Sequence, residues 1–373
     1  MGIRSPEALV EPGLLRWARE TAHLDVVSAA KKLDVTPDRV TEWEDGTSRP
    51  SVVQLDKISD VYHRPIGMLY LRRPPTEPAA PADFRKKSTG TISPELALQL
   101  RGARERRKIA LELAEVRPAP FDLRASLEEE PEDIARRARH ALGITLATQQ
   151  DLTSLNRWKD TIERADVLVF ETLGVKSTET RGFAIYEPTL PVIVLNGAES
   201  DTGRLFTLGH ELAHLMLGTT GLCGHEATPT GTEKFCDRVS GALLMPRDLL
   251  LAEFRRTAPD PLRRALTKLH RTFAVSEEAA LLRLRDLGAV KPEVAAPIIE
   301  EFERLLAGRK EAREDSTKIP YFRRLLKRHG TRFTREVVGA LERNSITFLD
   351  ASKYLGASTE HVQKLIEHAW APR

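Results

Sequence analysis

Two histidines and a nearby glutamate have the types and spacing of a metal-dependent hydrolytic site. Residues 210–214 read HELAH, which is an HExxH pattern. Residues i and i+4 of a helix lie one above the other, so the imidazoles of His210 and His214 can reach one ion. Glu211 lies about 100° further round such a helix. That is the place of a general base that takes a proton from the attacking water.

A third ligand follows on the next expected helix. Glu233 comes nineteen residues after His214, and Asp237 lies four residues further on the same helix face. Glu233 completes three protein ligands and leaves a fourth position for water. Asp237 can accept a hydrogen bond from the other ring nitrogen of a ligating histidine, with His210 as the expected partner. The predicted cofactor is Zn²⁺, and the ligand types leave manganese and iron open.

Helices and a small sheet must position these side chains. Strand-like runs rich in β-branched and aromatic residues cover 166–170, 181–186 and 191–196, and the chain returns to helices from 202 onward. Leucines at 205, 208, 212 and 215 give the HExxH helix a separate core face. We expect the edge strand of the sheet that contains 181–196 to hold an extended substrate by strand addition.

The N-terminal block has the layout of a helix-turn-helix. Apolar positions predict helices from 14, over 26–33 and over 37–44, with Thr36 as N-cap and Pro37 at the first helical position. Two short helices joined by a tight turn inside a small bundle define this motif. Residues 1–75 hold eleven basic and eleven acidic side chains, so the block is neutral. Because DNA affinity depends largely on neutralised phosphates, DNA binding and protein docking both stay open.

Composition limits the remaining possibilities. The chain has 373 residues, 57 basic against 54 acidic, and two cysteines. These numbers suit two or three domains in a reduced compartment and exclude a disulfide framework. With no run of eighteen apolar residues and no secretory signal at the start, we expect a cytoplasmic protein without a membrane span. The expected fold class is mainly α, with an α+β domain for the metal site.

Composition shifts also suggest domain boundaries. We expect a helix-turn-helix domain over 1–73, a Pro-rich linker over 74–93, the metal-site domain over 94–307 and a helical C-terminal region over 314–373. Within the last, 345–366 shows two apolar helix patterns around Gly356. This is either a second helix-turn-helix-like element or a helical hairpin that packs on the metal-site domain.

The N-terminal block resembles the XRE family of repressor-like DNA-binding domains over about residues 11–72. The resemblance implies that the helix 37–44 enters the major groove of double-stranded DNA. The residues nearest the bases would then be Thr36, Asp38, Arg39 and Glu42. The positions that carry the resemblance are Ala29-Ala30, Leu33, Val35, Val40, Trp43-Glu44, Gly46 and Pro50.

The metal-site region resembles the ImmA/IrrE family of zinc metallopeptidases. The matching segments are Val192-Ile193-Val194-Leu195-Asn196, Arg204-Leu205-Phe206-Thr207, 210–214, Glu233-Lys234-Phe235-Cys236-Asp237 and Leu243-Leu244-Met245-Pro246. The resemblance implies a zincin-like α+β fold and cleavage of a partner repressor or antitoxin, which switches on stress-response genes. A second copy of the chain is a further candidate partner. Two other interpretations are a DNA-binding regulator whose peptidase-like domain only senses a signal, and an antitoxin-like interaction protein.

Overall fold

The computed structural model describes residues 5–75, 92–149, 151–172, 174–223, 231–257, 260–309 and 321–369. The chain divides into two compact units, 1–102 and 103–373. Helices make up most of the described chain, and its four strands form one small sheet, so the expected fold class is confirmed. Most of the predicted linker lies outside the described residues, as do 314–320, and the domain boundaries stay predictions.

The first unit is a bundle of short helices around one apolar core. Leu15, Ala29, Val40, Trp43 and Leu55 are among its buried residues. Thr36 caps α3 and Pro37 opens it, as the sequence predicts. The helices are α1 (Pro12–Thr21), α2 (Val26–Leu33), α3 (Pro37–Asp45), α4 (Val52–Tyr62) and the 3-10 helix η1 (Ile66–Tyr70), followed by the start of α5 (Pro94–Leu113).

A buried ion pair fastens α3 to α1 in this unit. The Arg19 guanidinium donates to both carboxylate oxygens of Glu44, over 2.7 and 2.8 Å. It also donates to the Leu24 carbonyl over 2.9 Å, just before α2. Such two-pronged pairs fix direction as well as distance. One arginine therefore sets the positions of three helices of the motif.

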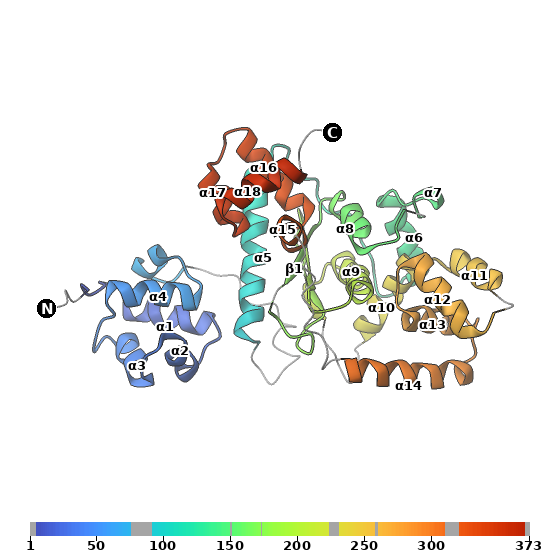
Figure 1. Cartoon of the computed structure of the whole chain (residues 1–373), viewed down its shortest axis with the longest axis horizontal. Coiled ribbons are helices and arrows are strands. Elements are labelled where there is room, and N and C mark those ends of the chain that lie inside the picture. Colours follow the sequence, from blue (N-terminus) through green and yellow to red (C-terminus); the bar gives the residue numbers. More distant parts are fainter. Residues whose placement is uncertain are drawn as a thin grey trace. The chain divides into compact units, whose positions relative to one another are not determined.

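The second unit holds the remaining helices and the sheet (Figure 1). Its helices before the sheet are α6 (Pro131–Ala141), α7 (Leu146–Gln149) and α8 (Leu155–Glu163). Those that follow β3 are α9 (Asp201–Met216), α10 (Gly231–Leu244), α11 (Arg247–Arg256), α12 (Leu262–Phe273), α13 (Glu277–Asp286) and α14 (Pro292–Arg309). The C-terminal helices are α15 (Tyr321–His329), α16 (Thr331–Glu342), α17 (Phe348–Leu355) and α18 (Thr359–Ala369). In the described part of the chain, no helix is long and apolar enough for a membrane crossing.

The sheet has the strand order β1-β3-β2-β4. Its strands are β1 (Leu168–Thr172), β2 (Gly182–Ile185), β3 (Val192–Asn196) and β4 (Gly221–Cys223). β3 runs parallel to β1, and β2 is antiparallel to both of its neighbours. The strands at 181–196, β2 and β3, are both interior, and substrate binding at an edge of this sheet stays a prediction. The edges are β1, which corresponds to the predicted run at 166–170, and the short β4, which the sequence patterns did not predict.

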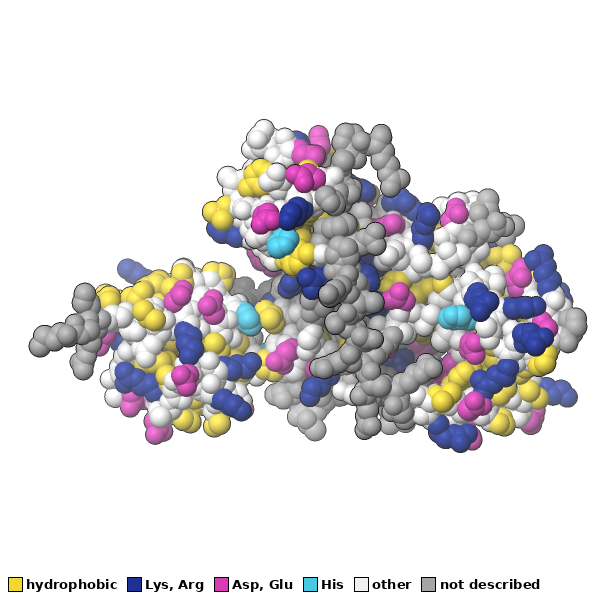
Figure 2. Space-filling model, viewed as in Figure 1, with side chains coloured by type: hydrophobic (Ala, Val, Ile, Leu, Met, Phe, Trp, Pro, Cys, Tyr) yellow, Lys and Arg dark blue, Asp and Glu magenta, His cyan; other side chains and the backbone are white. Residues whose placement is uncertain are grey.

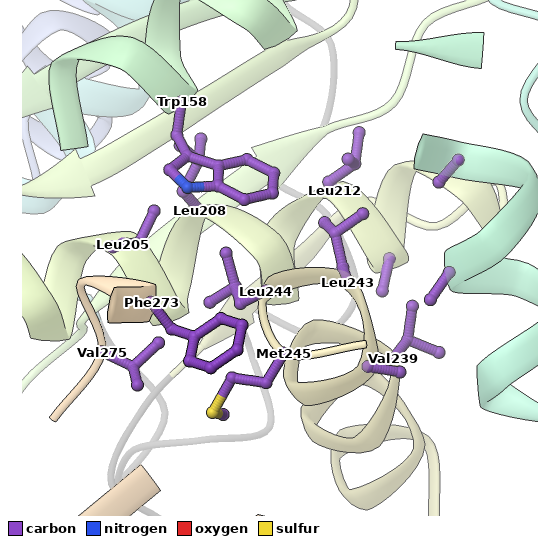
Figure 3. Packing of buried hydrophobic residues seen from close by; sticks show 14 of the residues in the cluster. Trp158, Leu205, Leu208, Leu212, Val239, Leu243, Leu244, Met245, Phe273 and Val275 are labelled. Carbon is purple, nitrogen blue, oxygen red and sulfur yellow. The ribbon is translucent and has the colours of Figure 1, made fainter. Parts of the chain in front are cut away.

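Helix α9 packs against β2 and β3 and forms the centre of the main core. Figure 3 shows Leu205, Leu208 and Leu212 on α9, close to Leu243 and Leu244 of α10. Burying a leucine side chain contributes about 1.5–3 kcal/mol. The apolar face predicted for the HExxH helix thus fixes its rotation and decides which side its polar residues take.

The C-terminal helices pack on the β1 side of the same unit, in red in Figure 1. Glu163 at the end of α8 accepts the backbone N–H groups of Thr331 and Arg332, at the start of α16. Lys159 joins Glu171 of β1 and the Lys327 carbonyl of α15. The expected helical C-terminal region is confirmed, and α15 and α16 pack on the unit that holds the sheet.

Candidate metal centre

Three side chains converge between α9 and α10. The Nε2 atoms of His210 and His214 lie 3.1 Å apart. The Glu233 carboxylate faces both, with Oε2 3.3 Å from His210 Nε2 and Oε1 3.5 Å from His214 Nε2. All three side chains are at least 87% buried, since their exposed fractions are 3%, 4% and 13%. The i, i+4 spacing and the first turn of α10 together bring these groups to one point.

This donor set fits a zinc ion. At metal–ligand distances of about 2.0–2.1 Å, the ligand atoms of a tetrahedral site lie roughly 3.3–3.4 Å from one another. The two Nε2 atoms lie 3.1 Å apart, and each has one Glu233 oxygen near that distance, Oε2 at 3.3 Å from His210 and Oε1 at 3.5 Å from His214. Two imidazoles and one carboxylate are also ligands that zinc takes in hydrolytic sites. The residues present therefore suit a zinc ion with three protein ligands.

Each histidine has a partner on its other ring nitrogen. Asp237 Oδ1 lies 2.8 Å from His210 Nδ1, the pairing expected from the sequence. Thr219 Oγ1 lies 3.2 Å from His214 Nδ1 and donates to the His214 carbonyl over 3.0 Å. Such partners fix the ring orientation and the tautomer that leaves Nε2 free for a metal. Thr219 was not found by sequence reasoning, because a threonine after a helix carries no ligand signal.

Cys236 also lies close enough to both histidines to be the third metal ligand in place of Glu233. Its sulfur and the ligand nitrogens of both histidines all lie within 4.8 Å of one another. The thiol is fully buried, and this burial raises the pKa of Cys236 to about 12. Glu233 turns both carboxylate oxygens toward the two Nε2 atoms, at 3.3 and 3.5 Å, whereas Cys236 would first have to lose its proton to bind a metal. We therefore favour Glu233 as the ligand.

Glu211 is fully buried on the adjacent face of α9, against β2. Gly182 of β2 makes this approach possible. A Cβ atom there would lie 3.5 Å from Glu211 Oε1 and only 2.7 Å from the Thr207 methyl group and the Val194 carbonyl oxygen. The strand can thus run close to the helix at the level of Glu211 only because position 182 lacks a side chain.

A second glycine sets the spacing of the two ligand helices. A Cβ atom on Gly209 of α9 would lie 2.6 Å from Ser240 Oγ and 3.4 Å from Ser240 Cα on α10. The Ser240 hydroxyl donates to the Phe206 carbonyl over 2.8 Å, which ties the helices together. Close approach of α9 and α10 is what brings Glu233 within reach of both imidazoles. Sequence reasoning passed over both residues.

Two arginines hold the far end of α10. Arg139 of α6 donates to the Leu243 carbonyl over 2.9 Å, and Arg283 of α13 donates to the Met245 carbonyl over 3.4 Å. Cations near a helix C-terminus satisfy its free carbonyls and complement its dipole. Burial lowers the pKa of Arg139 to about 10, so it stays charged at neutral pH. The helix that carries Glu233 is therefore fixed at both ends of the site.

The expected DNA-contact residues lie at the start of α3 in the other unit. Asp38 is exposed, and the Thr36 hydroxyl accepts the Arg39 N–H over 3.3 Å as the helix cap. Arg39 pairs with Glu42 over 2.9 Å, at the surface. On the face seen in Figure 2, acidic and basic side chains are interspersed over this unit. The unit therefore has the geometry of a helix-turn-helix, and its basic and acidic side chains are equal in number, as the sequence of 1–75 indicates.

Comparison with protein families agrees with this architecture. Residues 162–285 match the model of a peptidase family described as the IrrE N-terminal-like domain. Residues 15–69 match a helix-turn-helix model. No curated protein matches the chain. The first match runs from the end of α8 to α13 and contains the histidines, Glu233 and the whole sheet. The chain therefore joins an XRE-type helix-turn-helix domain to a peptidase domain of the ImmA/IrrE family.

Proposed function

We propose that this chain is a zinc-dependent endopeptidase with His210, His214 and Glu233 as metal ligands. The observation that carries the proposal is the convergence of the two Nε2 atoms, 3.1 Å apart, with one Glu233 carboxylate oxygen 3.3 Å from the first and the other oxygen 3.5 Å from the second. The match to a peptidase family over the same residues supports it. The same ligand types can also bind manganese or iron, so the test includes a measurement of which metal the purified chain contains.

The chain's own residues supply the proton transfers. A bound zinc ion would act as the Lewis acid that polarises the peptide carbonyl and makes water more acidic. Glu211 accepts the proton of the attacking water and then donates it to the leaving amine, as a general base and acid. Its full burial excludes bulk water from that exchange. Asp237 and Thr219 keep the two imidazoles turned with Nε2 toward the metal.

The helix-turn-helix in the same chain points to the substrate class. A peptidase joined to a domain of this type acts where transcription is regulated, so we infer a regulator protein as its substrate, either a repressor or an antitoxin. Cleavage would then change transcription of the regulated genes. The test is co-expression with the products of neighbouring genes, in search of a metal-dependent cleavage that a chelator abolishes.

Glu211→Gln separates this mechanism from its alternatives. The variant keeps the ligands, so we expect about one zinc per chain by elemental analysis and loss of substrate cleavage. Glu342→Gln, an exposed change on α16, is the matched control and should cleave normally. Cleavage by Glu211→Gln at the wild-type rate would exclude Glu211 as the general base. A purified wild-type chain without zinc affinity would overturn the proposal itself.

A DNA-binding regulator that senses metal without proteolysis is the second candidate, and the helix-turn-helix match favours it. In that case Thr36, Asp38, Arg39 and Glu42 would face the duplex. Arg39→Ala should then weaken duplex binding, as measured by fluorescence anisotropy, while zinc content stays unchanged. Zinc-dependent DNA affinity together with no cleavage of any co-expressed partner would favour this candidate over the first.

A further inference from the structure

Helices α17 and α18 repeat the helix-turn-helix of the first unit. The first helix of each pair has eight residues, Val26–Leu33 in α2 and Phe348–Leu355 in α17. Each ends at a left-handed residue, Asp34 with φ 60° and Gly356 with φ 55°. Segments 25–43 and 347–365 align without insertion or deletion. The helix-turn-helix family model covers only the first of them.

The hydrogen bonds of the two turns also coincide. In each pair, the residue after the left-handed one donates to a carbonyl five residues back, and a hydroxyl caps the second helix. The turn bonds are Val35 N to Ala30 O at 3.1 Å and Ala357 N to Ser352 O at 3.0 Å. The caps are Arg39 N to Thr36 Oγ1 and His361 N to Ser358 Oγ, both at 3.3 Å. The second helix therefore starts from the same turn in both motifs.

The buried positions match as well. A helix-turn-helix needs small or apolar residues at fixed places, because its two helices share one small core. The aligned pairs, each residue of which is at most 3% exposed, are Ala29 with Ala351, Leu33 with Leu355, Val40 with Val362 and Trp43 with Leu365. An ordinary helical hairpin would not require agreement in the turn, the caps and the core together.

At two positions the outer face of α18 differs from that of α3 in a direction that favours DNA, while Glu360 keeps the acid of Asp38 and His361 replaces Arg39. Lys364 stands where α3 has Glu42, and Gln363 stands where α3 has Thr41. Gln363 and Lys364 are both exposed. A glutamine amide can bond adenine through two hydrogen bonds, and a lysine can bond guanine or a phosphate. The Lys364–Glu360 ion pair is exposed on both sides, so it holds the ammonium group only weakly.

Among the described residues, the neighbouring elements cover His361, at the position of Arg39, but leave Gln363 and Lys364 exposed and add positive charge. α15 contacts α18 through Tyr321, whose ring lies 4.0 Å from that of His361. That contact covers the first turn of α18, while Gln363 and Lys364 stay exposed. Residues 321–369 hold nine basic and five acidic side chains, against the even balance of 1–75. Phosphate neutralisation drives most DNA affinity, so this excess counts toward a duplex partner.

We propose that α17–α18 is a second DNA-binding helix-turn-helix, with Gln363 and Lys364 of α18 facing the major groove of double-stranded DNA. The proposal is independent of the peptidase function, because none of its residues belongs to the metal centre. A chain with two such motifs would contact two separate sequence elements.

The test uses the full-length chain and a pool of random-sequence DNA duplexes. After selection, binding of the enriched duplex is measured by fluorescence anisotropy over a series of salt concentrations. We expect Lys364→Ala to weaken binding at least tenfold and to reduce the salt slope by about one. Gln363→Ala should relax the preference at a base position. Lys108→Ala, which removes an exposed positive charge from α5, is the matched control and should change neither.

A photoreactive amino acid at position 363 gives a second measurement that does not depend on loss of affinity. Crosslinking of that residue to the enriched duplex supports the proposal, and Thr41→Ala with Glu42→Ala should leave the crosslink in place. If Gln363→Ala with Lys364→Ala binds the duplex with wild-type affinity and sequence preference, the proposal is overturned. A crosslink that forms only to a protein overturns it as well.

Discussion

At the scale of residues, the metal centre depends on side chains that do not touch the metal. Asp237 and Thr219 each hold one imidazole by its Nδ1 atom, at 2.8 and 3.2 Å. Without such a partner a neutral imidazole can place its proton on Nε2, and a protonated Nε2 cannot bind zinc. Asp237 and Thr219 therefore favour the tautomer of each imidazole that carries its proton on Nδ1.

Removal of these partners should lower zinc affinity. We expect Asp237→Ala and Thr219→Val each to weaken zinc binding by about 10–100-fold, as measured by competition with a chromophoric chelator. Asp237→Asn keeps an acceptor oxygen and should lose less. Arg238→Ala, an exposed change beside Asp237, serves as the control. Wild-type affinity in Asp237→Ala would show that His210 is oriented by its helix alone.

In the first unit, the buried Arg19–Glu44 ion pair holds α1 and α3 together. Its side chains are only 11% and 5% exposed. Glu44→Ala should cost about 3–5 kcal/mol in unfolding free energy, measured by urea titration, because it leaves a buried guanidinium without its carboxylate. Arg19→Met combined with Glu44→Leu should recover most of that loss. Equal stability of Glu44→Ala and wild type would mean that water solvates Arg19.

At the scale of elements, the sequence predicts what is local and misses what arises between elements. The bounds of α2, α3 and the three longer strands follow closely from apolar spacing, caps and turn residues. The HExxH spacing likewise predicts that the two imidazoles meet, since one helix carries both. Sheet order is different, because a strand such as β4 with three residues carries too little pattern, and which strands lie at the edges depends on pairing. Gly182 and Gly209 matter only through their neighbours on another element.

The distance between α9 and α10 should therefore control zinc binding, and Gly209 allows this to be tested. Gly209→Ala places a methyl group 2.6 Å from Ser240 Oγ and 3.4 Å from its Cα, so α9 and α10 must move apart. We expect lower thermal stability and weaker zinc binding together, measured by melting with and without added zinc. Gly13→Ala is the control, because nothing lies within 4 Å of its added carbon in α1. That change should stabilise by less than the ~1 kcal/mol found in a helix interior, because Gly13 lies in the first turn of α1. If Gly209→Ala binds zinc with wild-type affinity, the distance between α9 and α10 does not determine zinc binding.

At the scale of the whole molecule, the C-terminal helices are part of the unit that holds the metal centre. They pack on β1, and β1 neighbours β3, against which α9 lies. The junction contains buried polar groups from α8, β1, α15 and α16, including Lys159, Glu171 and Glu163. Removal of α15–α18 would take the Thr331 and Arg332 N–H groups from Glu163 and the Lys327 carbonyl from Lys159. Stability of the junction should consequently influence the folding of the whole second unit.

His329 makes that junction sensitive to acid. Its ring is 2% exposed and lies against Phe333, and burial beside Arg106 and Arg328 lowers the pKa of His329 to about 3. A histidine in the unfolded chain has a pKa near 6.5, so between about pH 6.5 and 3 the unfolded state binds the extra proton. Stability is therefore full above pH 6.5 and falls with acidification, by up to about 1.4 kcal/mol per pH unit from this residue.

His329→Gln isolates this contribution, because the carboxylates and the other histidines titrate alike in both proteins. We expect the variant to be less stable than wild type at pH 7.5, since glutamine packs poorly on Phe333, and the gap should narrow steadily down to pH 4.5. Urea unfolding of the chelator-treated chain at four pH values measures the gap without metal binding. A gap that stays constant with pH would mean that folding does not lower the pKa of His329.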